Sequence, residues 1–137
     1  MFTSIKASAI SIKPRKWDKP HNADKLEALV TQAAKDRPDL IVTTEGVLEG
    51  YVVMDVLEDP SRTTEMIEIA EPIDGPYIRR FRKLASQLRT CLCLGFAERI
   101  EDEVYNAAVF IDHEGEIRGK YHKTMLAEGT GPNCIFN

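Results

Sequence analysis

The stretch PDLIVTTEGVLEGY, residues 38–51, decides the fold and raises the functional question. Its short apolar run LIV lies between a proline and two threonines, which predicts a strand over residues 40–43 that is buried on both faces. A carboxylate, Glu45, comes just past the end of this strand and is followed by a glycine. Open α/β sheets bind ligands outside the carboxyl ends of their strands, so Glu45 is a candidate for a ligand-facing position.

Upstream of this strand the sequence predicts one strand and one helix. Apolar and polar residues alternate over residues 4–12, which is typical of a strand. Asn22 is a suitable N-cap for a helix that runs to about Asp36, with an apolar stripe beginning at Leu26. Residues 52–72, downstream of the strand, do not favour one type of structure.

The second half of the sequence predicts a helix and three more strands. Pro76 suits the first turn of a helix with a regular apolar face. Strands are expected over residues 90–95, 105–111 and 116–122, and the last two flank a glycine-containing hairpin turn at residues 112–115. The order β-α-β-α-β-β-β predicts an α/β fold with a mixed sheet and helices packed on it.

Length and charge exclude several classes of protein. The chain has 137 residues, enough for one small domain with a core, and its net charge is −4. This charge does not favour a nucleic-acid partner. No stretch approaches the ~18 apolar residues of a membrane span, and the N-terminus lacks the apolar core of a signal peptide. We therefore expect a soluble, cytoplasmic protein with no nucleic-acid or membrane partner.

The three cysteines do not predict a disulfide framework, because their number is odd. Cys91 and Cys93 lie two residues apart in a predicted strand, so they share a face at a spacing of roughly 6.6 Å. A metal site would need further Cys or His nearby, and none follows. Both are expected to be small buried core residues, with no metal and no cofactor.

Three ordered blocks resemble the carbon–nitrogen hydrolases of the nitrilase superfamily. PDLIVTTEGVLEGY is similar to that family's strand, glutamate and closing G-Y segment, and EPIDGP before the second helix also fits. LGFAERIEDEVYNAAVFIDHEGEIRGKYHKTML is similar to the family's middle block, with G-x-A-E, Y-N-x-A and G-K-Y-x-K-T-x-L in order. The resemblance implies an αββα sandwich of the nitrilase type. Residues 1–137 would be the N-terminal portion of this single domain, which continues past Asn137.

The resemblance also implies a Cys–Glu–Lys catalytic set, in which Glu45 matches the glutamate and Lys123 matches the lysine. A carboxylate can take the thiol proton as general base, and an ammonium can stabilise the negative charge of a tetrahedral intermediate. Without the resemblance, both side chains would be interpreted as solvated surface groups. Glu49 is the rival for Glu45, but it lies further from the strand end.

The nucleophile is where this chain departs from the family. The family's cysteine lies on a strand well beyond the lysine, whereas Cys134 lies only a short way past Lys123 in a Gly/Pro-rich loop. Cys91 and Cys93 precede the lysine, so none of the three cysteines matches. The catalytic cysteine is therefore expected beyond residue 137.

Three other polar residues are candidates for supporting roles. Tyr51 either lines a substrate pocket or anchors its loop, and Glu128 is a candidate for the second acid of the family's site. Glu98 either supports the site or forms a structural ion pair with Arg99 or another base.

The fifth predicted strand carries three basic side chains near its end. His122 alternates with Lys123 and is expected to point to the opposite face, in a structural role. Lys120 is expected on the same face as Lys123, further from the strand's end.

The expected substrate is a small amide, carbamoyl compound or nitrile, and the complete protein is expected to be a homo-oligomer. One alternative is a non-catalytic fragment or degenerate homologue that acts as a binding or scaffold module. Another is a flavodoxin-like ligand-binding domain, although no glycine-rich phosphate loop follows the first strand.

Overall fold

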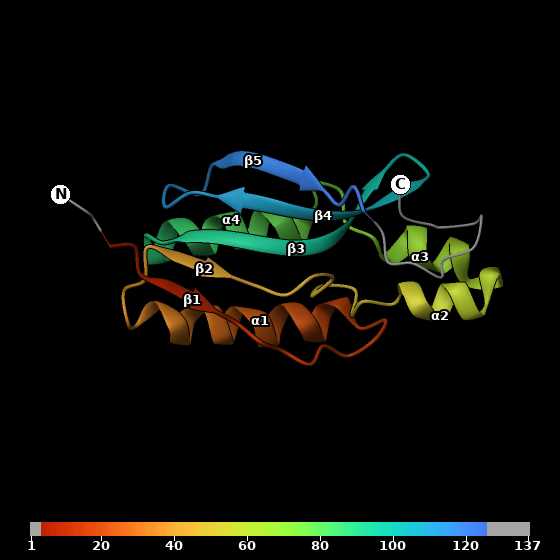
Figure 1. The fold of residues 1–137 in the computed structure, drawn as a ribbon, viewed down its shortest axis with the longest axis horizontal. Coiled ribbons are helices and arrows are strands. Elements are labelled where there is room, and N and C mark those ends of the chain that lie inside the picture. The colour runs from red at the N-terminus through yellow and green to blue at the C-terminus, as the bar shows by residue number, and fades with distance from the viewer. Residues whose placement is uncertain (1–3, 126–137) are drawn as a thin grey trace.

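A five-stranded mixed sheet forms the centre of the structure, a computed structural model that describes residues 4–125 (Figure 1). The strands lie side by side in chain order: β1 (Ala7–Ala9), β2 (Leu40–Val42), β3 (Cys91–Ile100), β4 (Glu103–Ile111) and β5 (Ile117–His122). The first three strands are parallel, and β4 and β5 each run antiparallel to the strand before them. The predicted α/β class and mixed sheet are confirmed.

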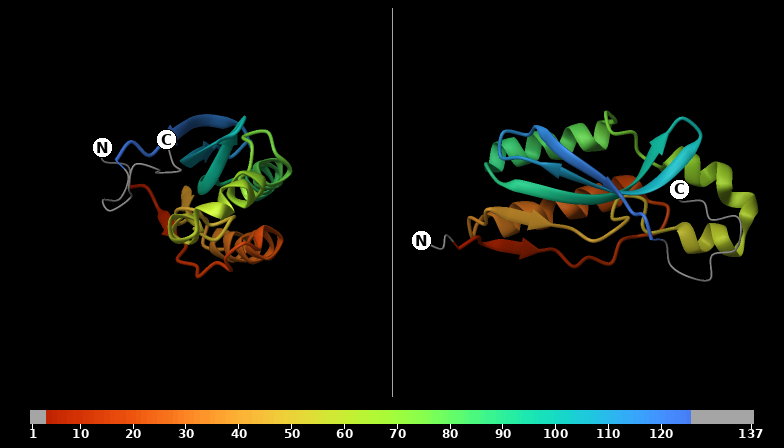
Figure 2. Two further views of the ribbon diagram at one scale, coloured as in Figure 1. Left: turned by 90° about the vertical axis from the view of Figure 1, so that its right-hand side faces the viewer. Right: turned by 45° about the horizontal axis from the view of Figure 1, so that its top comes forward.

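Two long helices, α1 (Lys19–Ala34) and α4 (Pro76–Leu88), cover one face of the sheet (Figure 2, left). Their apolar stripes are buried, with Leu26 in α1 and Phe81 in α4 fully inaccessible to solvent. These stripes were expected from the 3.6-residue periodicity. Among residues 4–125, no helix is both long enough and apolar enough to cross a lipid bilayer.

The predicted start of α1 at Asn22 is wrong. The helix begins at Lys19, and the side chain of Asp18 caps it by accepting a hydrogen bond from the backbone of His21 at 3.1 Å. Pro20 is compatible with the first turn, where its missing N–H costs nothing, so the helix starts earlier than the asparagine. Asn22 is instead fully buried, and its amide donates to the backbone carbonyl of Leu48 at 2.9 Å.

Two predicted strands have the wrong length. The first strand is limited to β1 because it pairs with only the three residues of β2. The third strand continues past Gly95 to Ile100, because its second half pairs with β4 as far as Glu103. This extra length matters for the site, since β3 extends beyond the end of β2.

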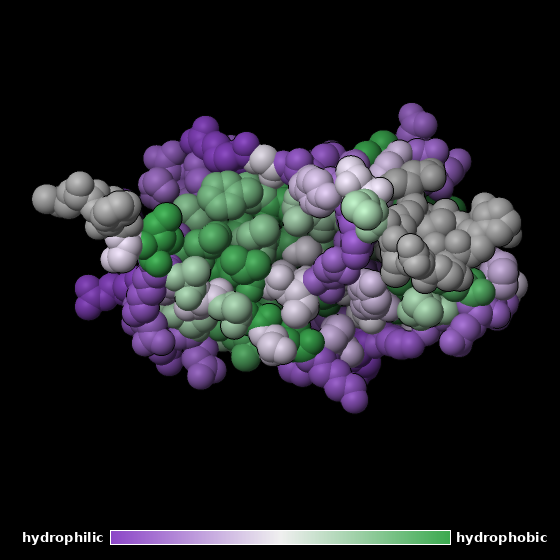
Figure 3. Space-filling model, viewed as in Figure 1, coloured by the Kyte–Doolittle hydropathy of each residue, from purple (hydrophilic) through white to green (hydrophobic). Residues whose placement is uncertain are grey.

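The face of the sheet opposite the two helices carries no other layer among residues 4–125. Figure 3 shows apolar side chains gathered over the strands on this face. Cys91 and Cys93 lie here and are half-buried, so the prediction that they are buried core residues is wrong. Phe110, the partner of Cys93 in the ladder, is 37% exposed, and Tyr121 is 58% exposed. We call this surface, defined by these four residues, the open face.

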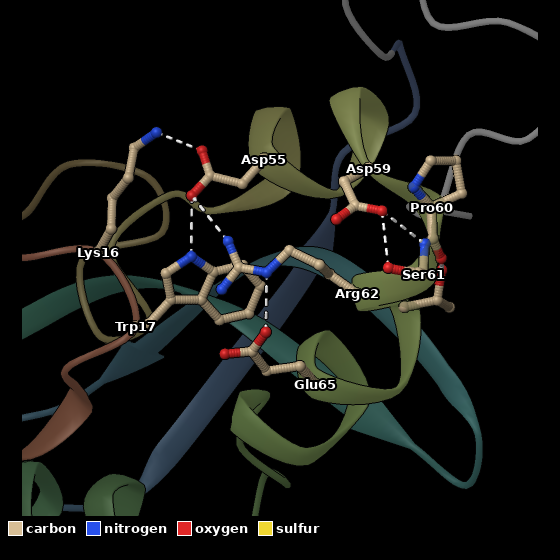
Figure 4. Close-up of polar contacts among 9 residues, drawn as sticks. Lys16, Trp17, Asp55, Asp59, Pro60, Ser61, Arg62 and Glu65 are labelled. Carbon is tan, nitrogen blue, oxygen red and sulfur yellow. Dashed lines mark hydrogen bonds and ion pairs between the residues drawn. The ribbon is translucent and has the colours of Figure 1, made fainter.

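The ambiguous segment 52–72 folds as two short helices, α2 (Val53–Glu58) and α3 (Thr63–Ile69), joined by a 3-10 turn, η1 (Pro60–Arg62). A small second core lies beneath them, with Met66 fully buried. Polar contacts fasten the segment to the loop before α1 (Figure 4). Asp55 accepts from the indole N–H of Trp17 at 2.8 Å, and the guanidinium of Arg62 lies 3.9 Å from the centre of a Trp17 ring.

Candidate active site

Glu45 and Lys123 meet although 78 residues separate them in the sequence. The Lys123 Nζ atom lies 3.0 Å from Oε1 of Glu45. Glu45 follows β2 and Lys123 directly follows β5. Because β5 is antiparallel to β4, which is antiparallel to β3, β5 runs in the same direction as β2. The carboxyl ends of both strands therefore lie at one edge of the sheet, which brings the two side chains together.

The chain after β2 is held tightly against β3. The backbone N–H of Thr43 donates to the carbonyl of Cys93 at 3.0 Å, and the Thr43 hydroxyl accepts the N–H of Gly95 at 3.0 Å. A side chain at Gly95 would not fit, because a Cβ atom there would lie 2.5 Å from the carbonyl oxygen of Thr44 and 3.0 Å from Cα of Glu45. The close approach of the two backbones fixes the position of Glu45.

Asn106 in β4 contacts both members of the pair, and we did not assign it a role from the sequence. Its side-chain amide donates to Oε2 of Glu45 at 3.5 Å. Its backbone carbonyl accepts the N–H of Lys123 at 2.9 Å. The signal that could have identified it is a polar side chain within the apolar strand YNAAVFI, because a buried polar group needs a partner.

The ion pair favours the charged form of Lys123. Its hydrogen bond to Glu45 is the main cause that raises the pKa of the Lys123 ammonium. The side chains of Lys123 and Glu45 are 30% and 49% exposed, so the pair is open to a ligand in the described part of the chain. An ammonium that stays protonated is suited to stabilising a negative charge beside it.

A cavity of about 470 Å³ lies beside the pair on the open face. Its lining combines Glu45, Lys123 and Asn106 with apolar and small side chains from β2 to β5, including Cys93 and Tyr121. A few polar groups within a mainly apolar lining are typical of small-molecule sites.

Glu49 does not enter this cavity. Its side chain is buried, and Oε2 accepts the backbone N–H of Ala97 at 3.0 Å. Burial is the main cause that raises the pKa of Glu49, and the Ala97 hydrogen bond opposes this rise. Of the two rival glutamates, Glu45 is therefore the one that the structure places beside Lys123.

The residues expected to bind substrate are less well placed. Tyr51 ends the loop in a left-handed conformation with φ of +54°, and its backbone N–H donates to the carbonyl of Gly46 at 2.9 Å. It is not among the residues that line the cavity in the described structure. Glu128 and Cys134 lie outside the described residues. The roles of Tyr51 and Glu128 stay predictions.

Glu98, Lys120 and His122 form a separate polar cluster on the helix-covered face of the sheet. The carboxylate of Glu98 is fully buried and contacts Lys120 Nζ at 2.7 Å and His122 Nε2 at 2.5 Å. Tyr105 stacks on the His122 ring, with the ring centres 4.4 Å apart.

This cluster decides two expectations from the sequence. The structural role expected for His122 fits these contacts, and Glu98 has bases other than Arg99 as partners. The expectation that Lys120 shares a face with Lys123 is wrong. Side chains two apart on a strand share a face, so Lys120 points with His122 and away from Lys123.

Neither described cysteine has the surroundings of an activated nucleophile. Cys93 lines the cavity, but burial raises the pKa of its thiol, which disfavours the reactive thiolate. Cys91 lies further along β3, towards its start. Neither thiol makes a hydrogen bond to Glu45 within residues 4–125.

Comparison with known proteins places these features in a family. The family model for carbon-nitrogen hydrolases matches residues 6–134. The chain is 31% identical over 111 residues to a citrullinase from Francisella tularensis, covering 80% of this chain and 37% of that protein. It is 28% identical over 143 residues to a bromoxynil-specific nitrilase from Klebsiella pneumoniae subsp. ozaenae, covering 96% and 41% respectively.

The fold agrees with a solved structure of the same superfamily. An amidase from Nesterenkonia sp. AN1, a protein of the nitrilase superfamily, superposes with a TM-score of 0.76 at 18% identity. The superposition covers 98% of this chain and 49% of the amidase, in a structure with acrylamide added at the active-site cysteine. The chain thus spans about half or less of the proteins it matches. The matches favour the resemblance to hydrolases over a flavodoxin-like domain.

Proposed function

The chain belongs to the carbon–nitrogen hydrolase family, and from this premise we propose that it supplies two of the three catalytic groups of an enzyme that hydrolyses non-peptide carbon–nitrogen bonds. The proposed substrates are small amides, carbamoyl compounds or nitriles. The relatives named citrullinase and nitrilase support these classes.

One observation carries the proposal: the 3.0 Å contact between Lys123 and Glu45 at the carboxyl ends of β2 and β5. An acid and a base from strands far apart in sequence converge beside a cavity, where a small molecule can reach both. Asn106 contacts both residues. Such convergence at a sheet edge is what an acid–base site requires.

The proposed mechanism needs a cysteine beyond residue 137, and the active-site cysteine of the Nesterenkonia amidase supports this. Glu45 takes the thiol proton, and the thiolate attacks the amide carbon. Lys123 stabilises the oxyanion of the tetrahedral intermediate. The protonated Glu45 then delivers its proton to the departing nitrogen. The C–N bond breaks, ammonia leaves, and the acyl group stays on the cysteine as a thioester. Glu45 next deprotonates a water, which attacks the thioester; the C–S bond breaks, the carboxylic acid leaves, and Glu45 returns the proton to the cysteine sulfur.

We also propose that residues 1–137 are the N-terminal portion of a single hydrolase domain and that the complete protein is a homo-oligomer. Two observations support the first part: the chain spans 37% and 41% of two relatives, and the sheet has an open face. A second layer of the sandwich would cover that face and enclose Glu45. Enclosure would exclude water and strengthen the electrostatic contacts of the site.

The alternative is a binding or scaffold module that has lost catalysis. It is favoured by one observation, that no thiol contacts Glu45 among residues 4–125. A panel of small amides, carbamoyl compounds and nitriles separates the two functions when ammonia release by the complete protein is measured. The enzyme releases ammonia from at least one member, and the scaffold releases it from none.

Glu45→Gln tests the assignment of the base in the same assay. The amide keeps the shape of the side chain but cannot take a proton, so kcat should fall by about 10²–10⁴-fold, the usual contribution of a general base. The thermal midpoint should change little, since Glu45 is half-exposed. Ammonia release near the wild-type rate in a correctly folded variant would exclude Glu45 as the base.

A further inference from the structure

The edge of β3 beyond the end of β2 has no strand beside it, and the loop that carries Glu45 takes the place of a strand. β2 ends at Val42, whereas β3 continues to Ile100. The backbone N–H of Val47 donates to the carbonyl of Gly95 at 3.2 Å. Two residues further along β3, the N–H of Ala97 meets the side chain of Glu49 at 3.0 Å. Beyond it, backbone pairing resumes, because the N–H of Glu71 donates to the carbonyl of Ala97 at 2.9 Å. In the described part of the chain, the buried carboxylate of Glu49 thus fills the one position between the loop and Glu71 where the β3 edge lacks a backbone acceptor.

Burying an ionisable group is costly, so the position of Glu49 needs a physical reason. Only 2% of the residue is exposed. A buried polar group is tolerated when it is hydrogen-bonded, and the Ala97 N–H would itself be unsatisfied without this partner. The carboxylate also lies under Gly46, where an added Cβ would be only 2.4 Å from Glu49 Oε1. Gly46 is the residue next to Glu45 and has a left-handed φ of +56°.

A chain of contacts leads from Glu49 to the candidate catalytic pair. Ala97 is directly opposite Asn106 in the β3–β4 ladder. Asn106 in turn donates to Glu45 and accepts the N–H of Lys123. Glu49 therefore binds the loop of Glu45 to Ala97. Asn106, the residue opposite Ala97, contacts both Glu45 and Lys123.

We infer that Glu49 is a positioning residue for Glu45: its side-chain oxygen, held on the Ala97 N–H and under Gly46, sets the loop so that Glu45 faces Lys123. This inference rests on the proposed function, since Glu45 must be the base for its position to matter. For this role, residue 49 needs a side chain as long as that of glutamate with a hydrogen-bond acceptor at its end. The role does not require a negative charge.

Two substitutions in the complete protein separate reach from charge. Glu49→Gln keeps the length and an acceptor oxygen, so kcat per folded molecule should stay within about threefold of wild type. Glu49→Asp keeps the charge but is one methylene shorter, so its carboxylate cannot reach the Ala97 N–H from the position beside Gly46. Its kcat should fall by about 10–100-fold with KM little changed, because an error of about 1 Å in a catalytic group costs up to ~10²-fold.

Glu98→Gln is the matched control, because Glu98 is also a fully buried glutamate of this part of the sheet but contacts Lys120 and His122 on the other face. It should lower the thermal midpoint and leave kcat per folded molecule unchanged. A merely structural role for Glu49 would give the same result for Glu49→Asp and would overturn the inference. A role in charge would reverse the order, with Glu49→Gln slower than Glu49→Asp, and would also overturn it.

Glu45→Gln, assayed beside these variants, distinguishes the two ways of failing. If Glu45→Gln retains wild-type turnover, the proposed base is wrong and the inference falls with it. If Glu45→Gln loses turnover while Glu49→Asp keeps it, the proposed function stands and the role of Glu49 is wrong. Fraction folded is measured by circular dichroism so that all rates refer to folded protein. If Glu49→Asp does not fold, Glu49→Gln alone still tests the inference. A Glu49→Gln variant that folds but loses turnover would contradict it.

Discussion

Lys120 and Lys123 are three residues apart, yet each meets a different carboxylate on a different face of the sheet. Lys120 contacts the fully buried Glu98, and Lys123 contacts the half-exposed Glu45 beside the cavity. The first pair joins β5 to the interior of the sheet, and the second leaves both charges open to a ligand. The two lysines therefore provide a matched test of which one takes part in the reaction.

Lys123→Ala in the complete protein should slow the chemical step by roughly 2.7–4 kcal/mol, the usual effect of removing one donor to an oxyanion. The reason is that the ammonium beside Glu45 is lost while the fold keeps its other contacts. Single-turnover measurements report the chemical step directly. Stability should change little, because an ion pair this exposed contributes little to folding.

Lys120→Ala is the control and should behave in the opposite way. Removing Lys120 takes one of the two hydrogen-bond partners that the buried carboxylate of Glu98 has among residues 4–125, so the thermal midpoint should fall. The single-turnover rate of the folded protein should match wild type. Equal losses of rate in both variants would indicate that a general positive potential, and not Lys123 in particular, stabilises the reaction.

Among single residues, the sequence predicted the Glu45–Lys123 pair but not the residues that contact and position it. Glu45 and Lys123 could be predicted because ordered motifs resemble those of carbon–nitrogen hydrolases, and the position of Glu45 just past a strand end agrees with this. Glu49 and Asn106 could not, since their roles depend on the residue of β3 or β4 that lies opposite. The Ala97 N–H is free for Glu49 only because β3 outlasts β2, a difference in length that local sequence patterns do not show.

The hairpin between β4 and β5 is organised by one carboxylate, Asp112. Its oxygens accept the backbone N–H groups of Glu114 and Glu116, each at 2.9 Å, and the side chain of Arg118 at 2.5 Å. These contacts close the predicted glycine-containing turn at the start of β5, the strand that Lys123 directly follows. The hydrogen bond to Arg118 is the main cause that lowers the pKa of Asp112 from 3.8 to about 2.

This shift predicts a pH dependence of stability for Asp112→Asn. The pKa is lower in the folded protein, so the carboxylate stabilises the fold fully above pH 3.8 and loses this effect as the pH falls towards about 2. The variant of the complete protein should therefore melt below wild type at neutral pH, and the difference should shrink between pH 4 and pH 2. Thermal melts at several pH values measure it, with the exposed Glu114→Gln as control. A difference that is independent of pH would contradict the ion pair as its cause.

The helices show where local sequence suffices and where it does not. The apolar stripes of α1 and α4 could be predicted because helix periodicity is a local property. The start of α1 could not, since Asp18 and Asn22 are both good caps in isolation. Asn22 does not cap the helix, because its side-chain amide donates to the backbone carbonyl of Leu48. Leu48 lies in the loop of Glu45 and is close to Asn22 only in the folded chain.

The sheet as a whole is covered by helices on one side and has the open face on the other (Figures 2 and 3). The apolar character of the strands predicted burial on both faces, and this expectation led to the wrong placement of Cys91 and Cys93. A local sequence pattern indicates that a strand face packs against other apolar side chains, but it does not indicate which segment of the chain provides them. On our proposal the neighbour is the second half of the sandwich, and this leads to a prediction for the 137-residue chain alone.

The chain of residues 1–137 should release no ammonia and should self-associate at micromolar concentration, because the open face exposes apolar side chains such as Phe110 and Tyr121. Sedimentation velocity should show oligomers, and Phe110→Lys should raise the monomer fraction by placing a charge in the centre of this face. Ammonia release is assayed in parallel with Cys93→Ala and Cys134→Ala, since Cys93 lines the cavity. Activity that disappears in either variant would identify that cysteine as the nucleophile and contradict a catalytic cysteine beyond residue 137. A wild-type chain that stays monomeric and unfolds in one sharp, reversible transition would contradict the proposal that its domain is incomplete.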